Sequence, residues 1–475
     1  MPATAKAETK TSPAASTPLR RKAAPAPQPR ERPLGPIGLL RALRANPITI
    51  WTRPHYEEKV VLRRTIIGPL LVVSDPAAIR YVLVDNALNY RKGVLQTRVL
   101  RPALGNGLLT AEGESWRLQR RALAPAFTPR LTESFQPAMA RAAAGLVERW
   151  GAWPDGSRID AARDMTHVTL KVLERTIFSD GLASEPATLA RAVTEYLDTL
   201  GRIHPFDALD LPAFIPRFGR GAGSDSLGTF DRAAEAIIER RRAQLARGEG
   251  PPRDLLTLLL EAERGEGGLK PEEVKANIAT FIAAGHETTA NTLSWCLFLL
   301  SFDPAWRERL EAEIDEVLGD GDLALAALPR LVVTKAVVEE ALRLYPPAPS
   351  ITRQPIGADR IAGLEVDHRT KVVISPWILH RHRLLWKDAE VFDPSRFLPG
   401  SREGIDRFAY LPFGAGPRIC IGQAFALQEA IILLAAICRE FRLDLAPGHE
   451  VRPVQRVTLR PQGGLPMIIR RRQSR

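Results

Sequence analysis

Cysteine is scarce in this chain: Cys296, Cys420 and Cys438 are the only ones among 475 residues. Three thiols without paired spacing exclude a disulfide-stapled scaffold, and they indicate a reducing compartment with at most one cysteine in a functional role. Long apolar runs are also lacking, because the longest, residues 431–438, is far below the ~18–20 residues of a membrane span. We therefore expect no transmembrane anchor and a soluble, cytoplasmic protein.

Acidic residues are outnumbered, but the excess positive charge is concentrated at the two ends of the chain. The sequence has 66 Lys and Arg against 54 Asp and Glu, a net charge of +12. Residues 1–33 hold seven bases and two acids, and residues 470–475 hold four arginines, which leaves about +3 for the region between them. No basic stripe interleaved with aromatics is present, so nucleic-acid binding is not expected.

The composition divides the chain into three parts. Residues 1–33 are rich in Ala, Pro and Ser and lack the apolar segment of a secretory signal. They are predicted to form a disordered basic tail, with a transit peptide as the alternative. Residues 34–469 are predicted to be one folded domain, and residues 470–475 a second basic tail.

The folded part has a helical pattern from Pro76 onward, interrupted by short segments rich in β-branched residues. Such segments occur at residues 58–74, 356–366 and 371–374 and again at the C-terminus, which predicts a small sheet. The expected fold class is therefore mainly α with a small β subdomain.

The segment around Cys420 has the features of a site that holds a thiolate. Small residues on both sides of Cys420 let the backbone turn tightly and direct amide N–H groups at the sulfur. A helical pattern, residues 422–441, follows, and the partial positive charge at a helix N-terminus favours a thiolate. A thiolate held in this way suits ligation of a haem iron. By contrast, Cys296 and Cys438 lie in apolar helical stretches and are predicted to be structural.

The same segment resembles the haem-binding signature of the cytochrome P-450 family, which it matches at five positions in ten residues: Phe413, Gly416, Arg418, Cys420 and Gly422. The resemblance covers about residues 34–469 and is to the soluble, bacterial-like type. It implies a cytochrome P-450 fold with haem b as cofactor and Cys420 as the iron ligand. It also implies that Phe413 packs against the thiolate, that Arg418 meets a haem propionate, and that Gly422 borders the cofactor.

A second motif, residues 284–289, lies in a helix predicted between Pro271 and Pro304. An acid beside two hydroxyls and a glycine is unusual in a buried helix, although a solvated polar patch would also explain it. Threonine hydroxyls that bond to a carbonyl one turn earlier bend a helix and would open a groove. The resemblance implies that Glu287 and Thr288 are the acid–alcohol pair that supplies protons, and that Ala284 borders the haem.

Further residues match the family in the expected order. Glu340 and Arg343 share one helix face, where an ion pair can form. The resemblance places them in a buried structural triad with Arg396.

Trp116 and Arg120 lie one helical turn apart, which an amphipathic helix with a snorkelling arginine would also produce. The resemblance makes them haem-propionate contacts and adds Arg353, a weaker signal.

The resemblance implies a haem-thiolate monooxygenase, an oxidoreductase that inserts one atom of O2 into an organic substrate and reduces the other to water. The electrons would come from a ferredoxin-type donor with its NAD(P)H-linked reductase, attracted by a basic surface around Arg418. Two alternatives remain open. One is a peroxygenase driven by H2O2, a type that usually lacks the acid–alcohol pair, and the other is a non-catalytic haem-binding sensor.

Substrate identity is open at this point. Family geometry implies a pocket lined near residues 94–109, 278–283, 350–351 and 464–465, which are mostly aliphatic. An apolar substrate, such as a fatty acyl chain or a terpenoid, is therefore expected. The apolar stretch 206–218 is interpreted as an entry lip, a membrane-touching patch or ordinary loop packing.

Overall fold

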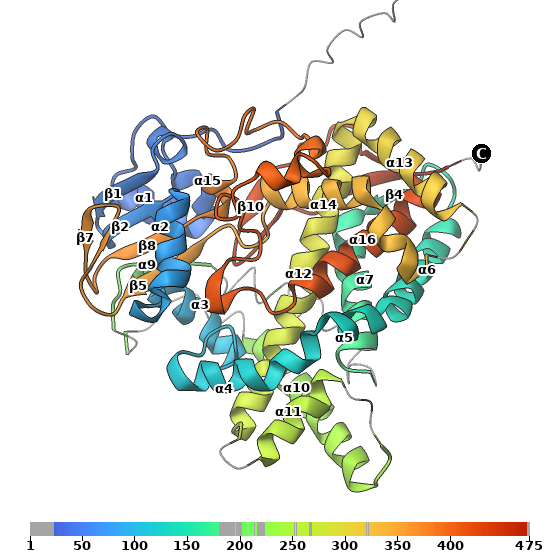
Figure 1. Cartoon of the computed structure of the whole chain (residues 1–475), viewed down its shortest axis with the longest axis horizontal. Coiled ribbons are helices and arrows are strands. Elements are labelled where there is room, and N and C mark those ends of the chain that lie inside the picture. Colours follow the sequence, from blue (N-terminus) through green and yellow to red (C-terminus); the bar gives the residue numbers. More distant parts are fainter. Residues whose placement is uncertain are drawn as a thin grey trace, which may run out of the picture.

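The structure is a computed structural model, and it describes residues 23–179, 195, 202–212, 214–215, 224–250, 252, 254–265, 268–319, 321 and 323–472. Helices dominate, and a five-stranded sheet lies at one side of the molecule, as Figure 1 shows. The predicted fold class, mainly α with a small β part, is confirmed.

The helices are α1 (Pro36–Ala45), α2 (Pro76–Arg80), α3 (Val94–Leu104), α4 (Gly113–Leu123), α5 (Pro129–Ser134), α6 (Gln136–Gly151), α7 (Ala161–Thr176), α9 (Pro205–Ala208), α10 (Ser224–Ala246), α11 (Leu255–Arg264), α12 (Pro271–Phe302), α13 (Pro304–Leu318), α14 (Val332–Leu344), α15 (Pro376–Leu379) and α16 (Gln423–Glu440). The segment 392–416, which has no sequence periodicity, contains only short 3-10 turns. One of them, η10 (Gly416–Arg418), lies just before Cys420.

Helix α12 is the central element of the fold (Figure 1), and it packs against α7, α14 and α16. It begins at Pro271, where a missing N–H costs nothing, and the Glu273 carboxylate accepts the backbone N–H of Lys270 at 3.1 Å. It ends before Asp303, whose side chain caps α13 through the N–H of Ala305. The predicted helix between Pro271 and Pro304 is confirmed.

The sheets are small and come from distant parts of the sequence. The five-stranded sheet has the order β1-β2-β8-β5-β3; β1 and β2 form an antiparallel hairpin, and β8 joins β2 in parallel. The other sheets are the hairpins β6–β7 and β10–β11 and the three-stranded sheet β4-β12-β9. The strands are β1 (Val60–Thr65), β2 (Gly68–Val73), β3 (Tyr90–Lys92), β4 (Arg158–Asp160), β5 (Ile351–Pro355), β6 (Asp359–Ile361), β7 (Leu364–Val366), β8 (Lys371–Ile374), β9 (Phe441–Leu445), β10 (Pro453–Gln455), β11 (Leu459–Pro461) and β12 (Pro466–Arg471).

The N-terminal boundary of the folded part lies earlier than expected. Residues 23–33, predicted to belong to a disordered tail, form a strap along the domain, which we call the N-terminal strap. Ala24 is buried, the Tyr345 hydroxyl donates to the carbonyl of Pro25 at 2.8 Å, and Arg30 exchanges backbone hydrogen bonds with the segment that starts at Trp51. Proline lacks an N–H, so this extended segment needs few partners of its own and can lie on the surface of the domain. Residues 1–22 lie outside the described residues.

The C-terminal boundary also differs from the prediction. Arg470 and Arg471 are the last residues of β12, so they belong to a sheet and not to a basic tail. Arg472 donates to the carbonyls of Cys438 and Arg439 at 2.9 and 3.1 Å. Its guanidinium thereby satisfies free carbonyls at the C-terminal end of α16, where a cation is also favoured by the helix dipole.

Deleting the N-terminal strap is expected to lower the thermal unfolding midpoint. Against a reference chain that lacks residues 1–22, removal of residues 1–33 deletes the buried Ala24, exposes the surface that Ala24 covers, and leaves the Tyr345 hydroxyl without its carbonyl partner. Each kcal/mol lost corresponds to roughly 2–4 °C in domains of 150–250 residues and to less in a larger one, so a decrease of a few degrees is expected in scanning calorimetry. Equal midpoints for the two truncated chains would contradict the assigned packing.

Candidate functional site

A cavity of about 590 Å³ lies between α12 and the loop that carries Cys420, within the ~300–1,000 Å³ usual for ligand sites. Its wall is mostly apolar. Aliphatic and aromatic side chains from α1, α3 and α12 and from the segments beside them make up much of it: Leu43, Ile50, Trp51, Val99, Leu100, Leu104, Leu108, Leu109, Phe281 and Ala283.

Cys420 lies at one wall of this cavity. Cys420 is an exposed residue, and the space to which it is exposed is the cavity. Burial raises the pKa of the thiol, and this shift is opposed by a hydrogen bond from the Gly422 backbone N–H and by the charge of Arg120. A sulfur that receives an N–H and faces a cation is prepared to act as a thiolate ligand.

The backbone before Cys420 requires glycine. Gly416 has φ = +74°, and a Cβ at this position would collide with the carbonyl oxygen of Leu83. The N–H of Cys420 donates to the carbonyl of Phe413 at 2.9 Å, which closes the turn. Phe413 and Gly422 line the cavity together with Cys420, so the motif residues are assembled at one wall.

The expected propionate contacts also meet at the cavity. Trp116, Arg120, Arg353 and Arg418 all line it. Arg418 lies 5.3 Å from the centre of the Trp116 ring and forms an ion pair with Glu112, with Nη1 to Oε1 at 2.6 Å. Burial lowers the pKa of Arg353 to about 10, and burial also lowers the pKa of Arg120.

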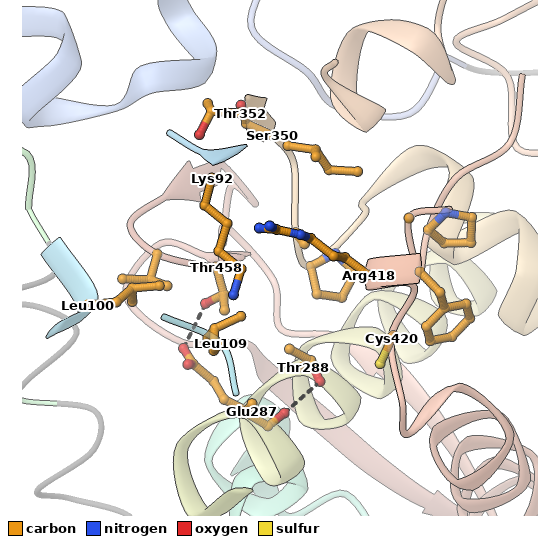
Figure 2. Close-up of a pocket in the computed structure, with 18 of the residues that line it drawn as sticks. Lys92, Leu100, Leu109, Glu287, Thr288, Ser350, Thr352, Arg418, Cys420 and Thr458 are labelled. Atoms are coloured by element: carbon orange, nitrogen blue, oxygen red, sulfur yellow. Dashed lines mark hydrogen bonds between the residues drawn. The ribbon is translucent and has the colours of Figure 1, made fainter. Parts of the chain in front are cut away.

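Lys92 is a site residue that no sequence pattern singled out. Its Nζ donates to the carbonyls of Leu108 and Ala111 at 3.0 and 2.8 Å, and the side chain borders the cavity from β3. Burial lowers the pKa of Lys92 to about 7. Figure 2 shows that Lys92 and Arg418 extend into the same part of the cavity. In the sequence Lys92 is a lone lysine without a motif, and only its contacts in the folded chain identify it as a residue of the site.

The acid–alcohol motif lies on α12, where its side chains diverge. The Thr288 hydroxyl borders the cavity and donates to the carbonyl of Ala284 at 3.0 Å, which is the back-bonding expected from the sequence. Helix α12 is continuous through this point. The Glu287 carboxylate is buried and accepts a hydrogen bond from the Thr458 hydroxyl at 2.7 Å. In Figure 2, Thr288 lies on the side of Cys420, whereas the Glu287 carboxylate points toward Thr458. Ala284, a small residue, faces the cavity.

The expected triad is assembled away from the cavity. Glu340 and Arg343 are completely buried and form two hydrogen bonds of 2.6 and 2.7 Å. Nε of Arg396 lies 3.7 Å from the Glu340 carboxylate. Arg343 also donates to the carbonyls of Ala389 and Val391. The pair therefore fixes the start of the long segment that leads to Cys420.

One part of the expected pocket lining is wrong. Gly464 and Leu465 do not border the cavity, and the turn between β10 and β11, residues 455–458, takes that place. Gly464 has φ = +92° and stands in a turn, but Leu465 donates its N–H to Asp160 at 2.9 Å and leads into β12. The turn of residues 455–458 precedes β11, and the turn that contains Gly464 follows it. Only the first of these two turns borders the cavity. The other expected lining segments all contribute residues.

The stretch 206–218 is described only in part, because residues 213 and 216–218 lie outside the described residues. Asp207 and Asp210 border the cavity, and Phe214 is 84% exposed. Asp210 forms an ion pair of 2.9 Å with Arg98 of α3. The described part therefore forms a wall of the cavity near its rim.

Glu429 of α16 makes the stability of the protein depend on pH. Burial raises its pKa well above the ordinary range of a glutamate, and Thr289, its polar neighbour, only partly opposes this shift. The folded state therefore holds this proton more tightly than the unfolded state, so stability is lost as pH rises above the ordinary carboxyl range. We expect Glu429→Gln to flatten the decline of the unfolding midpoint between about pH 5 and 8. Thermal melts across that range, with Glu450→Gln at an exposed position as control, would test this; parallel curves for wild type and Glu429→Gln would contradict it.

Comparisons with known proteins agree with this geometry. A family model described as cytochrome P-450 matches residues 57–466. Cyclooctatin synthase of Streptomyces melanosporofaciens is 33% identical over 402 residues, which cover 84% of this chain and 86% of that protein. Pentalenene oxygenase of Streptomyces avermitilis is 34% identical over 400 residues, covering 83% of this chain and 86% of that protein.

The fold is likewise similar to a solved structure, the haem domain of a cytochrome P-450. The TM-score is 0.80 at 26% identity, and the match covers 96% of this chain and 99% of that one. Among the described residues, no helix combines the length and apolarity needed to cross a membrane. The family match and the long alignments with these relatives lead to one conclusion: the chain belongs to the cytochrome P-450 family and is a monooxygenase of that family.

Proposed function

We propose that the protein is a haem-thiolate monooxygenase that uses O2 to oxidise an apolar organic substrate. The observation that carries this proposal is the Cys420 thiol, which borders a largely apolar cavity and has Thr288 across from it (Figure 2). A haem bound through a thiolate supplies O–O cleavage and oxidation of the substrate. The residues of this chain hold the cofactor, exclude water and supply protons.

The donor set fits haem b. The Cys420 thiolate would ligate the iron, and small Ala284 would leave room for the cofactor beside α12. The propionates require cations; Lys92 is buried and Arg353 is partly buried, and the pKa values of both are lowered chiefly by burial. Neither forms an ion pair with a carboxylate among the described residues, so a propionate would supply the missing charge. Arg418, Trp116 and Arg120 would complete this contact.

The protons would pass along α12. The Glu287 carboxyl is the only described acidic side chain of α12 that borders the cavity. Thr288, the next residue, presents its hydroxyl to the space beside Cys420. A carboxyl and an adjacent hydroxyl can hold and pass a proton in a region that the apolar wall keeps poor in water.

The substrate would be an apolar compound such as a terpenoid. The wall formed by α3 and the segment after it is aliphatic. Pentalenene oxygenase is named for the oxidation of a hydrocarbon, and it is similar over most of this chain. A hydrocarbon skeleton gains its binding energy from the burial of apolar area, which this cavity offers, and needs few hydrogen-bond donors.

The electrons would come from a ferredoxin-type protein with its NAD(P)H-linked reductase. The expected attraction to a basic surface around Arg418 needs revision, because the Arg418 side chain pairs with Glu112 at the cavity and is only 18% exposed. Exposed arginines occur instead on α4 and α5: Arg117, Arg121 and Arg130. Helix α5 packs against α16, the helix that follows Cys420, so these arginines could attract an acidic donor near the thiolate.

The proposal is tested by spectra of the purified, haem-containing protein. The ferrous protein with carbon monoxide should show the absorption typical of a thiolate-ligated haem. Titration of the ferric protein with terpenes, fatty acids, steroids and small aromatics should give a saturating spin-state change with one apolar class. A missing thiolate spectrum would refute the proposal. Turnover supported by peroxide alone and insensitive to Thr288→Ala would favour a peroxygenase.

A further inference from the structure

A hydrogen bond between distant parts of the chain ends on the carboxylate of Glu287. The Thr458 hydroxyl donates to the Glu287 carboxylate at 2.7 Å, and Figure 2 shows this bond beside the cavity. Both residues are more than nine-tenths buried. A buried hydrogen bond to a carboxylate is worth more than one between neutral groups, so this contact can fix the rotamer of the acid.

The direction of this bond is fixed by a third residue. The Asn291 side-chain amide donates to the oxygen of Thr458 at 3.3 Å. Because an amide nitrogen can only donate, it occupies a lone pair of the hydroxyl and leaves the single hydroxyl proton for Glu287. Asn291, Thr458 and Glu287 thus form a chain of donors that ends on the carboxylate.

The turn that carries Thr458 is attached to one face of α12. Glu287, Asn291 and Trp295 follow each other at intervals of four residues, so they lie on the same helix face. The Trp295 indole N–H donates to the carbonyl of Leu459 at 3.4 Å. The N–H of Leu459 donates to Pro347 at 3.0 Å on the other side of the turn. Thr458 is therefore held at a defined point relative to α12.

From this geometry we propose that Thr458 is a positioning residue for proton delivery, acting through the Glu287 carboxylate. The inference rests on the proposed function, in which Glu287 supplies protons. Thr458 stabilises the charged carboxylate and keeps it in one rotamer, so that every turnover starts from the same arrangement. Without the hydroxyl, the carboxylate loses the Thr458 hydrogen bond and the orientation that this bond gives it, and the electrons reduce O2 to H2O2 or water without oxidation of the substrate.

The turn also borders the substrate space. Gln455, Arg456 and Val457 line the cavity beside Thr458. A substrate that contacts Val457 therefore touches the same turn that holds the acid. Substrate contact and acid position are in this way connected through one short segment.

The test compares Thr458→Val, which keeps the shape but removes the hydroxyl, with Thr458→Ser, which keeps the hydroxyl. We expect Thr458→Val to lower the product formed per NAD(P)H consumed by about 10-fold, a part of the ~10²–10⁴-fold that general acid catalysis contributes. The substrate affinity, measured by the spin-state titration, should change less than about twofold. Thr458→Ser should restore coupling. A purely structural role would not distinguish serine from valine in this way.

A second readout needs no turnover. Thermal unfolding of the holoenzyme is compared for Thr458→Val, Glu287→Gln and the double variant, and we expect non-additive midpoints because the two side chains interact directly. Thr176→Val is the matched control, since Thr176 is a buried threonine whose hydroxyl bonds to its own helix at 2.8 Å and which does not border the cavity. Its midpoint shift should add to that of Glu287→Gln.

The outcomes separate this inference from the proposed function. If Glu287→Gln uncouples turnover but Thr458→Val does not, the positioning role of Thr458 is refuted and the monooxygenase assignment stands. The same holds if serine and valine behave alike. If Glu287→Gln leaves coupling unchanged, Glu287 has no role in proton supply and the inference fails with it. If the wild type shows no thiolate-haem spectrum, both proposals fall.

Discussion

Replacement of Cys420 by serine is expected to eliminate substrate oxidation and the thiolate-type spectrum of the ferrous carbon monoxide complex. A serine hydroxyl is a poor replacement because it stays protonated near neutral pH and is a hard ligand, whereas the cysteine thiolate donates electron density to the iron. The backbone of the turn is kept by the Cys420 N–H and by Gly416, so the fold should persist. Absorption spectra, product analysis and circular dichroism together measure these effects.

The matched control is Cys438→Ser. Cys438 is buried among apolar residues of α16, and burial raises its pKa to about 12, which keeps the thiol protonated and inert. This variant should retain the thiolate-type spectrum and turnover and lose only some thermal stability, because a buried polar hydroxyl costs free energy. Full turnover by Cys420→Ser would remove the basis of the functional assignment.

Substitution of Arg343 by alanine is expected to have the largest effect on stability. Arg343 and Glu340 are completely buried, and loss of the guanidinium leaves the Glu340 carboxylate without its main partner in the interior. Removal of one partner from a buried ion pair costs about 3–5 kcal/mol. The carbonyls of His380, Ala389 and Val391 lose their donor as well. The soluble yield and the unfolding midpoint of the variant should both decrease sharply.

Two further variants test the cause of this effect. Arg343→Lys keeps the charge but cannot present five N–H groups in a planar fork, so it should recover only part of the stability. Arg452→Ala removes an exposed arginine paired with Glu450 and should leave the midpoint nearly unchanged. If Arg343→Ala and Arg452→Ala had equal midpoints, the buried pair would not hold the segment before Cys420 in place.

Local features of the sequence were sufficient to predict many elements. Proline is the first residue of both α12 and α13, and these two prolines marked the limits of the central helix, because proline is tolerated in the first turn and not inside a helix. The β-branched stretches within residues 58–74 predicted part of a small sheet, and the structure shows that they form the hairpin β1–β2. The turn around Cys420 was also predictable from local sequence, because its glycines and its thiol lie within ten residues of one another.

The ends of the domain were predicted less well. The N-terminal strap has the composition of a disordered tail, yet Ala24 and the carbonyl of Pro25 contact the domain. Composition reports whether a segment can form its own core, and it does not report whether a segment binds to the core of another part. Arg472, in the same way, can donate to the carbonyl of Cys438 only because the fold places the end of α16 beside it.

The sequence by itself determined the family, the thiol and the acid–alcohol motif, because each depends on residues close together along the chain. Only the tertiary structure decided which distant groups join them. Lys92 borders the cavity because β3 pairs with β5, and Thr458 meets Glu287 across 171 positions of sequence. A hydrogen bond depends on distance and angle in space, and long-range packing places these partners without leaving a local pattern that could be recognised in the sequence.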